Sequence, residues 1–155
     1  MRGAAEARRM GIVFGQPEVD FQALYGIDGR HELPETMLPH LRGYAGSQPV
    51  RIGNAAWTQL QLDIFGELMD AVYLVNKYGD AISHEGWKHV REVVDQVCET
   101  WQTKDVGIWE MRGPSRHFTH SKVMAWVALD RAIRSVEAFG LAGDVAAWRS
   151  LREVI

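Results

Sequence analysis

The stretch NAAWTQLQLDIFGELMDAVYLVNKYG, residues 54–79, decides the fold class. Its apolar side chains recur three or four positions apart, which places them on one face of an α-helix. They are Trp57, Leu60, Ile64, Leu68, Val72 and Val75. Asn54 suits the N-cap and Gly79 suits the C-terminal end. We therefore predict one amphipathic helix from Asn54 to Gly79.

Further helices follow toward the C-terminus. Ser83 is the expected N-cap of the next one, whose apolar stripe is Trp87, Val90, Val94, Val97 and Trp101. A third helix is predicted after Phe118 and ends at Gly140, with an apolar face at Val123, Trp126 or Val127, Leu129, Ile133 and Val136. A second face of small residues permits close helix approach, at Ala125, Ala128 and Ala132.

The two ends of the chain differ in pattern. Residues 144–155 begin a fourth helix, with Val145, Trp148, Leu151 and Ile155, that is interrupted without a capping glycine or proline. Before Gly53 we expect irregular structure, with a turn over residues 25–30 and no strand pairing. The predicted class is therefore all-α, built of stacked helical hairpins, with one domain as the default for this length.

A long loop is predicted between the second and third helices. The helical periodicity stops at Gln102 and resumes after Phe118, and Gly107, Gly113 and Pro114 interrupt any regular element. The loop is rich in polar and aromatic side chains, namely Asp105, Trp109, Glu110, Arg112, Arg116 and His117. This density indicates a functional segment, because binding and catalytic residues concentrate on loops.

Composition excludes several classes of protein. The formal net charge of −3 leaves no excess of basic residues for a phosphate backbone or an anionic membrane. No apolar run reaches the length of a membrane span, and the N-terminal residues lack a secretory signal, so we expect a cytoplasmic protein. The single cysteine, Cys98, excludes a disulfide scaffold. We expect no metal and no other cofactor.

Three stretches together resemble bacterial and archaeal members of glycoside hydrolase family 15, the glucoamylases and trehalases. They are LYGIDGRHELPE (residues 24–35), GYAGSQPVRIGNAAWTQLQLDIFGELMDA (residues 43–71) and GIWEMRGPSRHFTHSKVMAWVALDRA (residues 107–132). The resemblance implies an (α/α)6 barrel of which residues 21–155 form a part, with residues 1–20 unmatched. Family catalytic domains are several times longer than this chain.

The same resemblance implies inverting hydrolysis of α-glucosides with Glu110 as general acid. Such enzymes place two carboxyl groups across the scissile bond, about 6.5 to 9.5 Å apart. Trp109 beside Glu110 is expected to disfavour the ionised carboxylate and to stack near the reaction centre. No residue matches the family's general base, and we assign that role neither to Glu67 nor to Asp63.

Other polar residues in the matched stretches are candidates for binding sugar hydroxyls: Arg51, Asn54, Gln61 and Arg112. Helix capping or surface solvation explains each of them equally well. His117 and His120 have the spacing of a metal-binding pair, but loop anchoring is the better interpretation. Met111 stands where fungal glucoamylases carry a second glutamate, which favours trehalose over starch-like substrates as the partner of this protein.

Two hypotheses follow. In the first, the protein is an α-glucoside hydrolase of the trehalase or glucoamylase type, and its substrate is trehalose or a maltooligosaccharide. In the second, the chain is a truncated, inactive helical remnant of such an enzyme. Apolar helix faces left uncovered in a partial barrel would then promote self-association.

Overall fold

A computed structural model describes residues 22–155, and the predicted unmatched segment 1–20 lies outside them. The described residues divide into two compact units. Residues 22–60 form the hairpin unit and residues 61–155 form the helical unit. No helix in the described part of the chain is long and apolar enough to cross a membrane.

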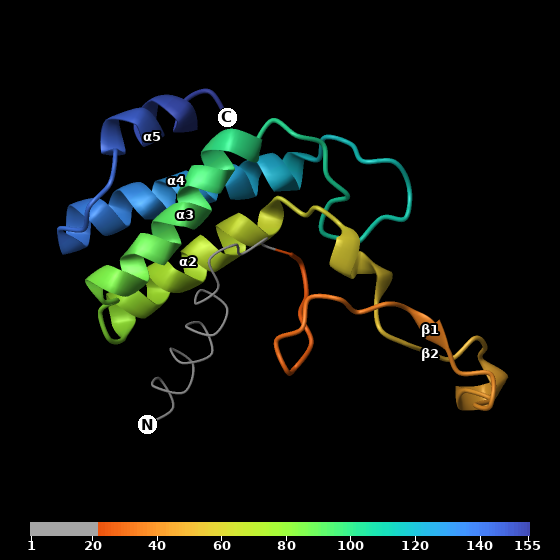
Figure 1. The fold of residues 1–155 in the computed structure, drawn as a ribbon. Helices are drawn as coiled ribbons and strands as arrows, with labels where there is room; N and C mark the ends of the chain where they lie inside the picture. Colours follow the sequence, from red (N-terminus) through yellow and green to blue (C-terminus); the bar gives the residue numbers. More distant parts are fainter. Residues whose placement is uncertain (1–21) are drawn as a thin grey trace. The chain divides into compact units, whose positions relative to one another are not determined.

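The helical unit contains α2 (Asp63–Tyr78), α3 (His84–Thr100), α4 (Thr119–Phe139) and α5 (Val145–Arg152). Figure 1 shows how the four helices are arranged, and α4 contacts each of the other three. Regular structure in this unit is helical, apart from one isolated bridge in the loop between α3 and α4. The all-α prediction is therefore confirmed.

The prediction of one helix from Asn54 to Gly79 was wrong at its start. Residues Ala55–Thr58 form a separate 3-10 turn, η2, and α2 begins only at Asp63. Asn54 does act as a cap, but for η2, by accepting a hydrogen bond from the Ala56 N–H at 2.9 Å. At the start of α2 the Leu62 N–H donates to a side chain 43 residues away, which local periodicity cannot reveal.

The predicted apolar face of α2 was only partly right, because Val72 is buried as predicted but Ile64 and Leu68 are partly exposed. Phe65, Met69 and Val72 are buried, whereas Val75 is 57% exposed. The reason is the approach of α4: a Cβ on Gly66 would lie 2.3 Å from the Met124 carbonyl oxygen. Backbones this close need a glycine, so Gly66 lies where α2 closely approaches α4 at Met124.

The other helices agree better with the sequence. In α3, Ser83 caps the N-terminus and the stripe of Trp87, Val90, Val94 and Val97 is buried. In α4, the face of Ala125, Ala128 and Ala132 is buried as predicted, and Gly140 ends the helix. The same close packing leaves Val123 and Trp126, assigned to the apolar face, 50% and 38% exposed.

Helix α5 is attached to the other helices by burial of Trp148, and a hydrogen bond and charged pairs hold the same region. Trp148 is 4% exposed, and the Trp87 indole N–H donates to the Ala142 carbonyl at 2.7 Å in the connection before α5. Asp130, 3% exposed in its side chain, pairs with Arg131, Arg134 and Arg152 at 2.6, 2.8 and 2.9 Å. Because a buried charge needs partners, this cluster holds α5 in one register on α4.

The hairpin unit corrects the expectation of no strand pairing. Strands β1 (Thr36–Met37) and β2 (Arg51–Ile52) pair antiparallel, with Thr36 opposite Ile52. A 3-10 turn, η1 (Tyr44–Gly46), lies between them. The strands are too short to show an alternating pattern, so the sequence carried no signal for them. The predicted turn is present, with the Gly29 N–H donating to the Gly26 carbonyl at 2.8 Å.

Candidate active site

The loop predicted between the second and third helices connects α3 to α4, and its two arms are joined near its base. The Asp105 N–H donates to the Arg116 carbonyl at 2.9 Å, and the Arg116 N–H donates back to the Asp105 carbonyl at 2.8 Å. This antiparallel bridge closes a loop of residues 106–115. Figure 1 shows the loop, in teal, projecting from the ends of α3 and α4.

Glu110 occupies an unusual backbone conformation within this loop. Its φ is +49°, and its N–H donates to the Gly107 carbonyl at 3.3 Å. The left-handed region costs a residue with a Cβ about 1–2 kcal/mol. Among residues 22–155 the other non-glycine residue with positive φ is Ala45. Such strain often occurs at functional sites, and Glu110, the candidate general acid, shares this conformation with Ala45.

The turn before Glu110 is fixed by Phe118. Gly107 has a φ of +69°, and a Cβ on it would lie 3.1 Å from the Phe118 ring. The ring therefore packs against the Gly107 backbone. The start of the Glu110 turn is held against the residue that caps α4.

Around Glu110 the loop presents both apolar and polar side chains to solvent. Trp109 is 84% exposed, Ile108 and Met111 are 46% and 51% exposed, and Arg112 is also exposed. Glu110 itself is half-buried. An exposed indole beside a carboxyl and a guanidinium is a chemically suitable combination for a sugar, which offers hydroxyls at its edge and C–H groups on its face.

Asp105 lies at the base of the loop, and the sequence did not indicate its structural role there. Its side chain is 1% exposed, and its Oδ2 accepts hydrogen bonds from the Leu62 N–H at 3.0 Å and the Ser121 hydroxyl at 2.7 Å. Leu62 precedes α2 and Ser121 lies in the first turn of α4. In the sequence Asp105 was one of six polar or aromatic loop residues, and its partners lie 43 and 16 positions away.

A second buried carboxyl lies at the start of α2. Asp63 is 4% exposed. Burial raises the pKa of Asp63, and the charge of Asp105 raises it further, against the opposing effects of backbone hydrogen bonding and of His120. In the helical unit, the side chains of Asp63 and Asp105 are therefore close enough for their charges to interact.

The remaining predicted binding residues divide between the two units. Trp109, Glu110 and Arg112 share the loop, and Gln61 is a buried residue before α2 in the same unit. Arg51 and Asn54 belong to the hairpin unit. There Arg51 pairs with Glu35 at 3.2 Å, and Asn54 caps η2.

The two histidines near the loop have no metal-binding arrangement. His117 and His120 are both exposed. Within residues 22–155 no group of three or more histidine, cysteine or acidic side chains could hold a metal ion.

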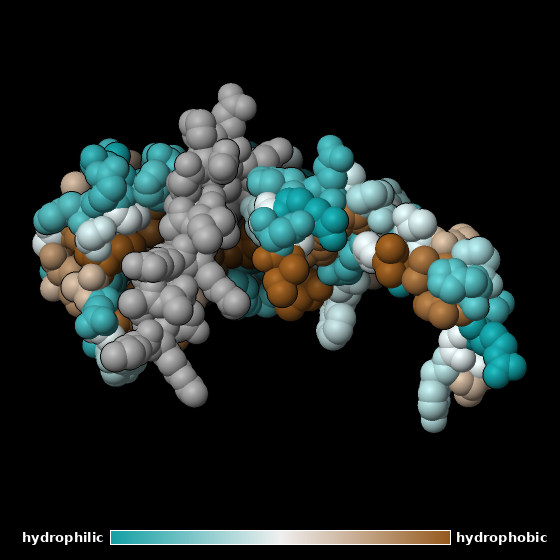
Figure 2. All heavy atoms as spheres, turned by 60° about the horizontal axis from the view of Figure 1, so that its bottom comes forward, coloured by the Kyte–Doolittle hydropathy of each residue, from teal (hydrophilic) through white to brown (hydrophobic). Residues whose placement is uncertain are grey.

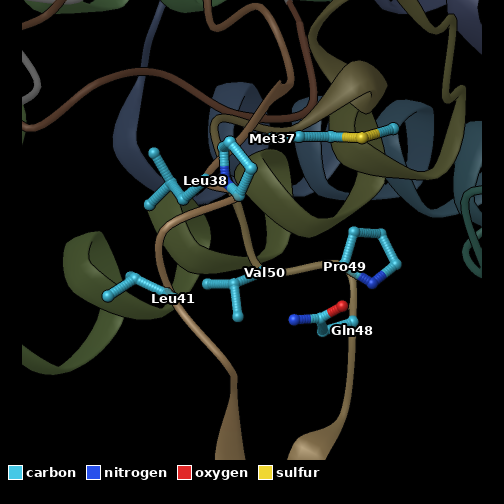
Figure 3. A pocket seen from close by; sticks show the side chains of 7 residues that line it. Met37, Leu38, Leu41, Gln48, Pro49 and Val50 are labelled. Atoms are coloured by element: carbon cyan, nitrogen blue, oxygen red, sulfur yellow. The ribbon is translucent and has the colours of Figure 1, made fainter.

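The hairpin unit also contains a small apolar pocket. Figure 3 shows that both arms of the hairpin contribute to its lining, which consists of Met37, Leu38, Pro39, Leu41, Gln48, Pro49 and Val50. The lining has no ionisable side chain, so the pocket offers shape and apolar surface without an acid or a base. None of the predicted site residues lines it.

The chain is similar in sequence to a family of known proteins and to several of its members. The model of the family "Glycosyl hydrolases family 15" matches residues 15–155. A trehalase of Mycolicibacterium smegmatis is 43% identical over 134 residues, which cover 86% of this chain and 20% of that protein. Trehalase 1 of Sulfolobus acidocaldarius is 47% identical over 134 residues, covering 81% of this chain and 24% of that protein.

A trehalase of Mycobacterium tuberculosis is 41% identical, again over 86% of this chain and 20% of the relative. The chain thus spans about a fifth to a quarter of the length of the curated relatives it matches. No solved structure shows significant similarity.

Proposed function

Because this chain belongs to the glycosyl hydrolases of family 15, we propose that the protein hydrolyses α-glucosides and that trehalose is its preferred substrate. The similarity to three trehalases over more than four-fifths of this chain supports that substrate. Met111 supports it as well, since the position carries no second carboxylate beside Glu110.

The general acid in this proposal is Glu110, and one observation carries it. Glu110 adopts a left-handed backbone, at φ +49°, in a loop closed by the Asp105–Arg116 bridge. A closed stem holds the carboxyl in one place, and proton donation to the leaving oxygen requires the donor within hydrogen-bond reach. The exposed Trp109 ring beside it supplies an apolar platform for the glucose.

The proposed reaction inverts the configuration at the anomeric carbon. Glu110 protonates the glycosidic oxygen while a second carboxylate activates a water molecule on the opposite face of the sugar. We assign no residue of this chain to that base. Inversion predicts that the hydrolysed α-glucosyl unit is first released as β-glucose, which proton NMR can detect before mutarotation. Initial release of α-glucose only would contradict inversion.

The substrate is tested by measuring glucose release from trehalose and from maltose at matched concentrations. The proposal predicts the larger kcat/KM for trehalose. The reverse order would move the assignment to glucoamylase-like activity. Release from neither, by protein whose circular dichroism shows the expected helix content, would overturn the proposal and support the inactive remnant instead.

Arg112 and Gln61 are proposed to bind sugar hydroxyls, since they belong to the same unit as Glu110. Gln61 is buried and its Nε2 has no hydrogen-bond partner among the described residues. A buried donor without a partner costs free energy, so a ligand hydroxyl that reaches it gains affinity. Arg51 and Asn54 keep the same proposed role within the hairpin unit, beside their structural contacts.

Self-association remains a prediction that concerns the helical unit. Apolar side chains of α2 and α4 are partly exposed. Figure 2 shows apolar atoms (brown) at the surface in several places among hydrophilic ones. The exposed residues are Leu74, Val75, Tyr78, Val123, Trp126 and Phe139. Sedimentation velocity at several protein concentrations tests for association. A single monomeric species throughout would contradict it.

A further inference from the structure

We propose that Asp105 is a positioning residue for Glu110, which acts by fixing the stem of the loop to the ends of two helices. The proposal rests on the function proposed above, in which Glu110 is the proton donor. Asp105 itself is buried beneath the loop, 1% exposed, and is placed to act on the loop and not on the substrate.

The first support is that one carboxylate oxygen joins three segments of the chain. Asp105 Oδ2 accepts from the Leu62 N–H before α2 and from the Ser121 hydroxyl on α4, while the Asp105 main chain forms both bonds of the bridge to Arg116. Hydrogen bonds to an ionised acceptor are about twice as strong as those between neutral groups. Burial strengthens them further, because little water competes for the oxygen.

The second support is that neighbouring contacts hold the same stem. The Lys122 ammonium donates to the Trp101 and Thr103 carbonyls, the latter at 3.0 Å, and so fixes the chain before Asp105. On the other arm, Phe118 packs on Gly107. The stem is therefore held from both sides, and Asp105 is the contact that connects it to α2.

The position of the stem affects the reaction because the rate of proton donation depends on the distance between the acid and its substrate. Glu110 lies five positions after Asp105 in the chain, so a shift of the stem moves the carboxyl without any direct contact. A displacement of about 1 Å between an acid and its substrate can cost on the order of 10²-fold in rate. Such a loss is selective, because it applies only to substrates whose leaving group requires a proton.

Three variants separate the effect of the hydrogen bonds from that of the charge. Asp105→Asn keeps an oxygen that can accept from both Leu62 and Ser121, whereas Asp105→Ala removes the acceptor. Ser121→Ala removes one donor and leaves the carboxylate. Asp95→Ala is the matched control, since Asp95 is an exposed aspartate on α3.

The first measurement is amide hydrogen exchange on the full chain. Asp105→Ala should accelerate exchange at Leu62, Glu110 and Arg116 by about tenfold, the equivalent of one lost hydrogen bond. Asp105→Asn should exchange nearly as slowly as the unsubstituted protein, and Ser121→Ala should accelerate exchange less than Asp105→Ala does. The buried α3 amides should keep their protection in all three variants. Unchanged exchange in Asp105→Ala, or equal acceleration in every helix, would overturn the proposal.

The second measurement is the rate on two substrates, trehalose and α-glucosyl fluoride, whose fluoride leaves without needing a proton. Asp105→Ala should lower kcat on trehalose by about ten- to a hundredfold. The loss on the fluoride should be much smaller, as it should be for Glu110→Gln. Equal losses on both substrates would make Asp105 a structural residue and overturn the proposal. If Glu110→Gln matches the unsubstituted protein on trehalose, the proposed function fails, and the exchange data still decide whether Asp105 fixes the loop.

Discussion

The main chains of Asp105 and Arg116 exchange two hydrogen bonds, 2.9 and 2.8 Å long, across the base of the loop that carries Glu110. The two residues are eleven positions apart and lie in no regular sheet. Their pairing turns a glycine- and proline-containing segment into a loop with a defined stem. The closed stem restricts where the backbone of Glu110 can lie, and the proton donation proposed for its carboxyl requires such a defined position.

The bridge can be broken without altering a side chain in the site. Arg116→Pro removes the N–H that donates to the Asp105 carbonyl, whereas Arg116→Ala keeps it. We expect Arg116→Pro to lower the stability of the helical unit by about 1–3 kcal/mol and to reduce glucose release. Thermal unfolding and the glucose assay measure the two effects. Similar behaviour of the two variants would show that the bridge has no such role.

The left-handed conformation of Glu110 predicts an order of stability between two variants that lack its carboxyl. Glu110→Gly and Glu110→Ala both remove the carboxyl, but glycine tolerates a φ of +49° without the Cβ penalty. The glycine variant should be more stable than the alanine variant by about 1 kcal/mol, as measured by urea unfolding. An alanine variant that is equally or more stable would mean that Glu110 is not strained.

The buried Asp63 predicts a pH dependence of stability. Burial raises the folded-state pKa of Asp63 above its ordinary value of 3.8, so the folded protein favours the protonated form. Stability contributed by Asp63 is therefore present at low pH and is lost as the pH rises through the raised pKa. Asp63→Asn should raise the thermal unfolding midpoint at pH 7, by roughly 2–4 °C for each kcal/mol by which the free energy of unfolding increases. The increase should be smaller at pH 4. The exposed Asp95→Asn is its control, and a gain that is independent of pH would contradict the assignment.

Close packing of α2 on α4 predicts a large effect of a single methyl group. Gly66→Ala would place a Cβ 2.3 Å from the Met124 carbonyl oxygen, so one helix must move. We expect a loss of about 1–3 kcal/mol in the free energy of unfolding. Gly113→Ala is the matched control, since a Cβ there meets nothing within 4 Å. Equal stability of the two variants would refute the close approach.

Local patterns predicted the parts of the fold that local interactions determine. The cap at Ser83, the buried stripe of α3 and the left-handed end of α4 at Gly140 each depend on residues within a turn or two. The loop before α4 was predicted because glycine and proline break helical periodicity. Glu110 and its loop neighbours were found through the resemblance of a short motif, which also depends on adjacent residues.

Contacts between distant residues account for what the sequence did not reveal. The start of α2 depends on Asp105, which lies 43 positions after Leu62, and its buried face depends on Gly66 against Met124. The strands β1 and β2 are two residues long each, too short for a pattern. The role of Asp105 appears only when the partners of its carboxylate are known in space.

Glucose release from trehalose by the unsubstituted protein and by Glu110→Gln is the most direct test. Glutamine keeps the shape of glutamate but cannot donate the proton, so kcat should fall by about 10²–10⁴-fold, whereas Glu67→Gln, at an exposed glutamate of α2, should retain the unsubstituted rate. A Glu110→Gln variant that hydrolyses trehalose at the unsubstituted rate would contradict the assignment of Glu110 as general acid.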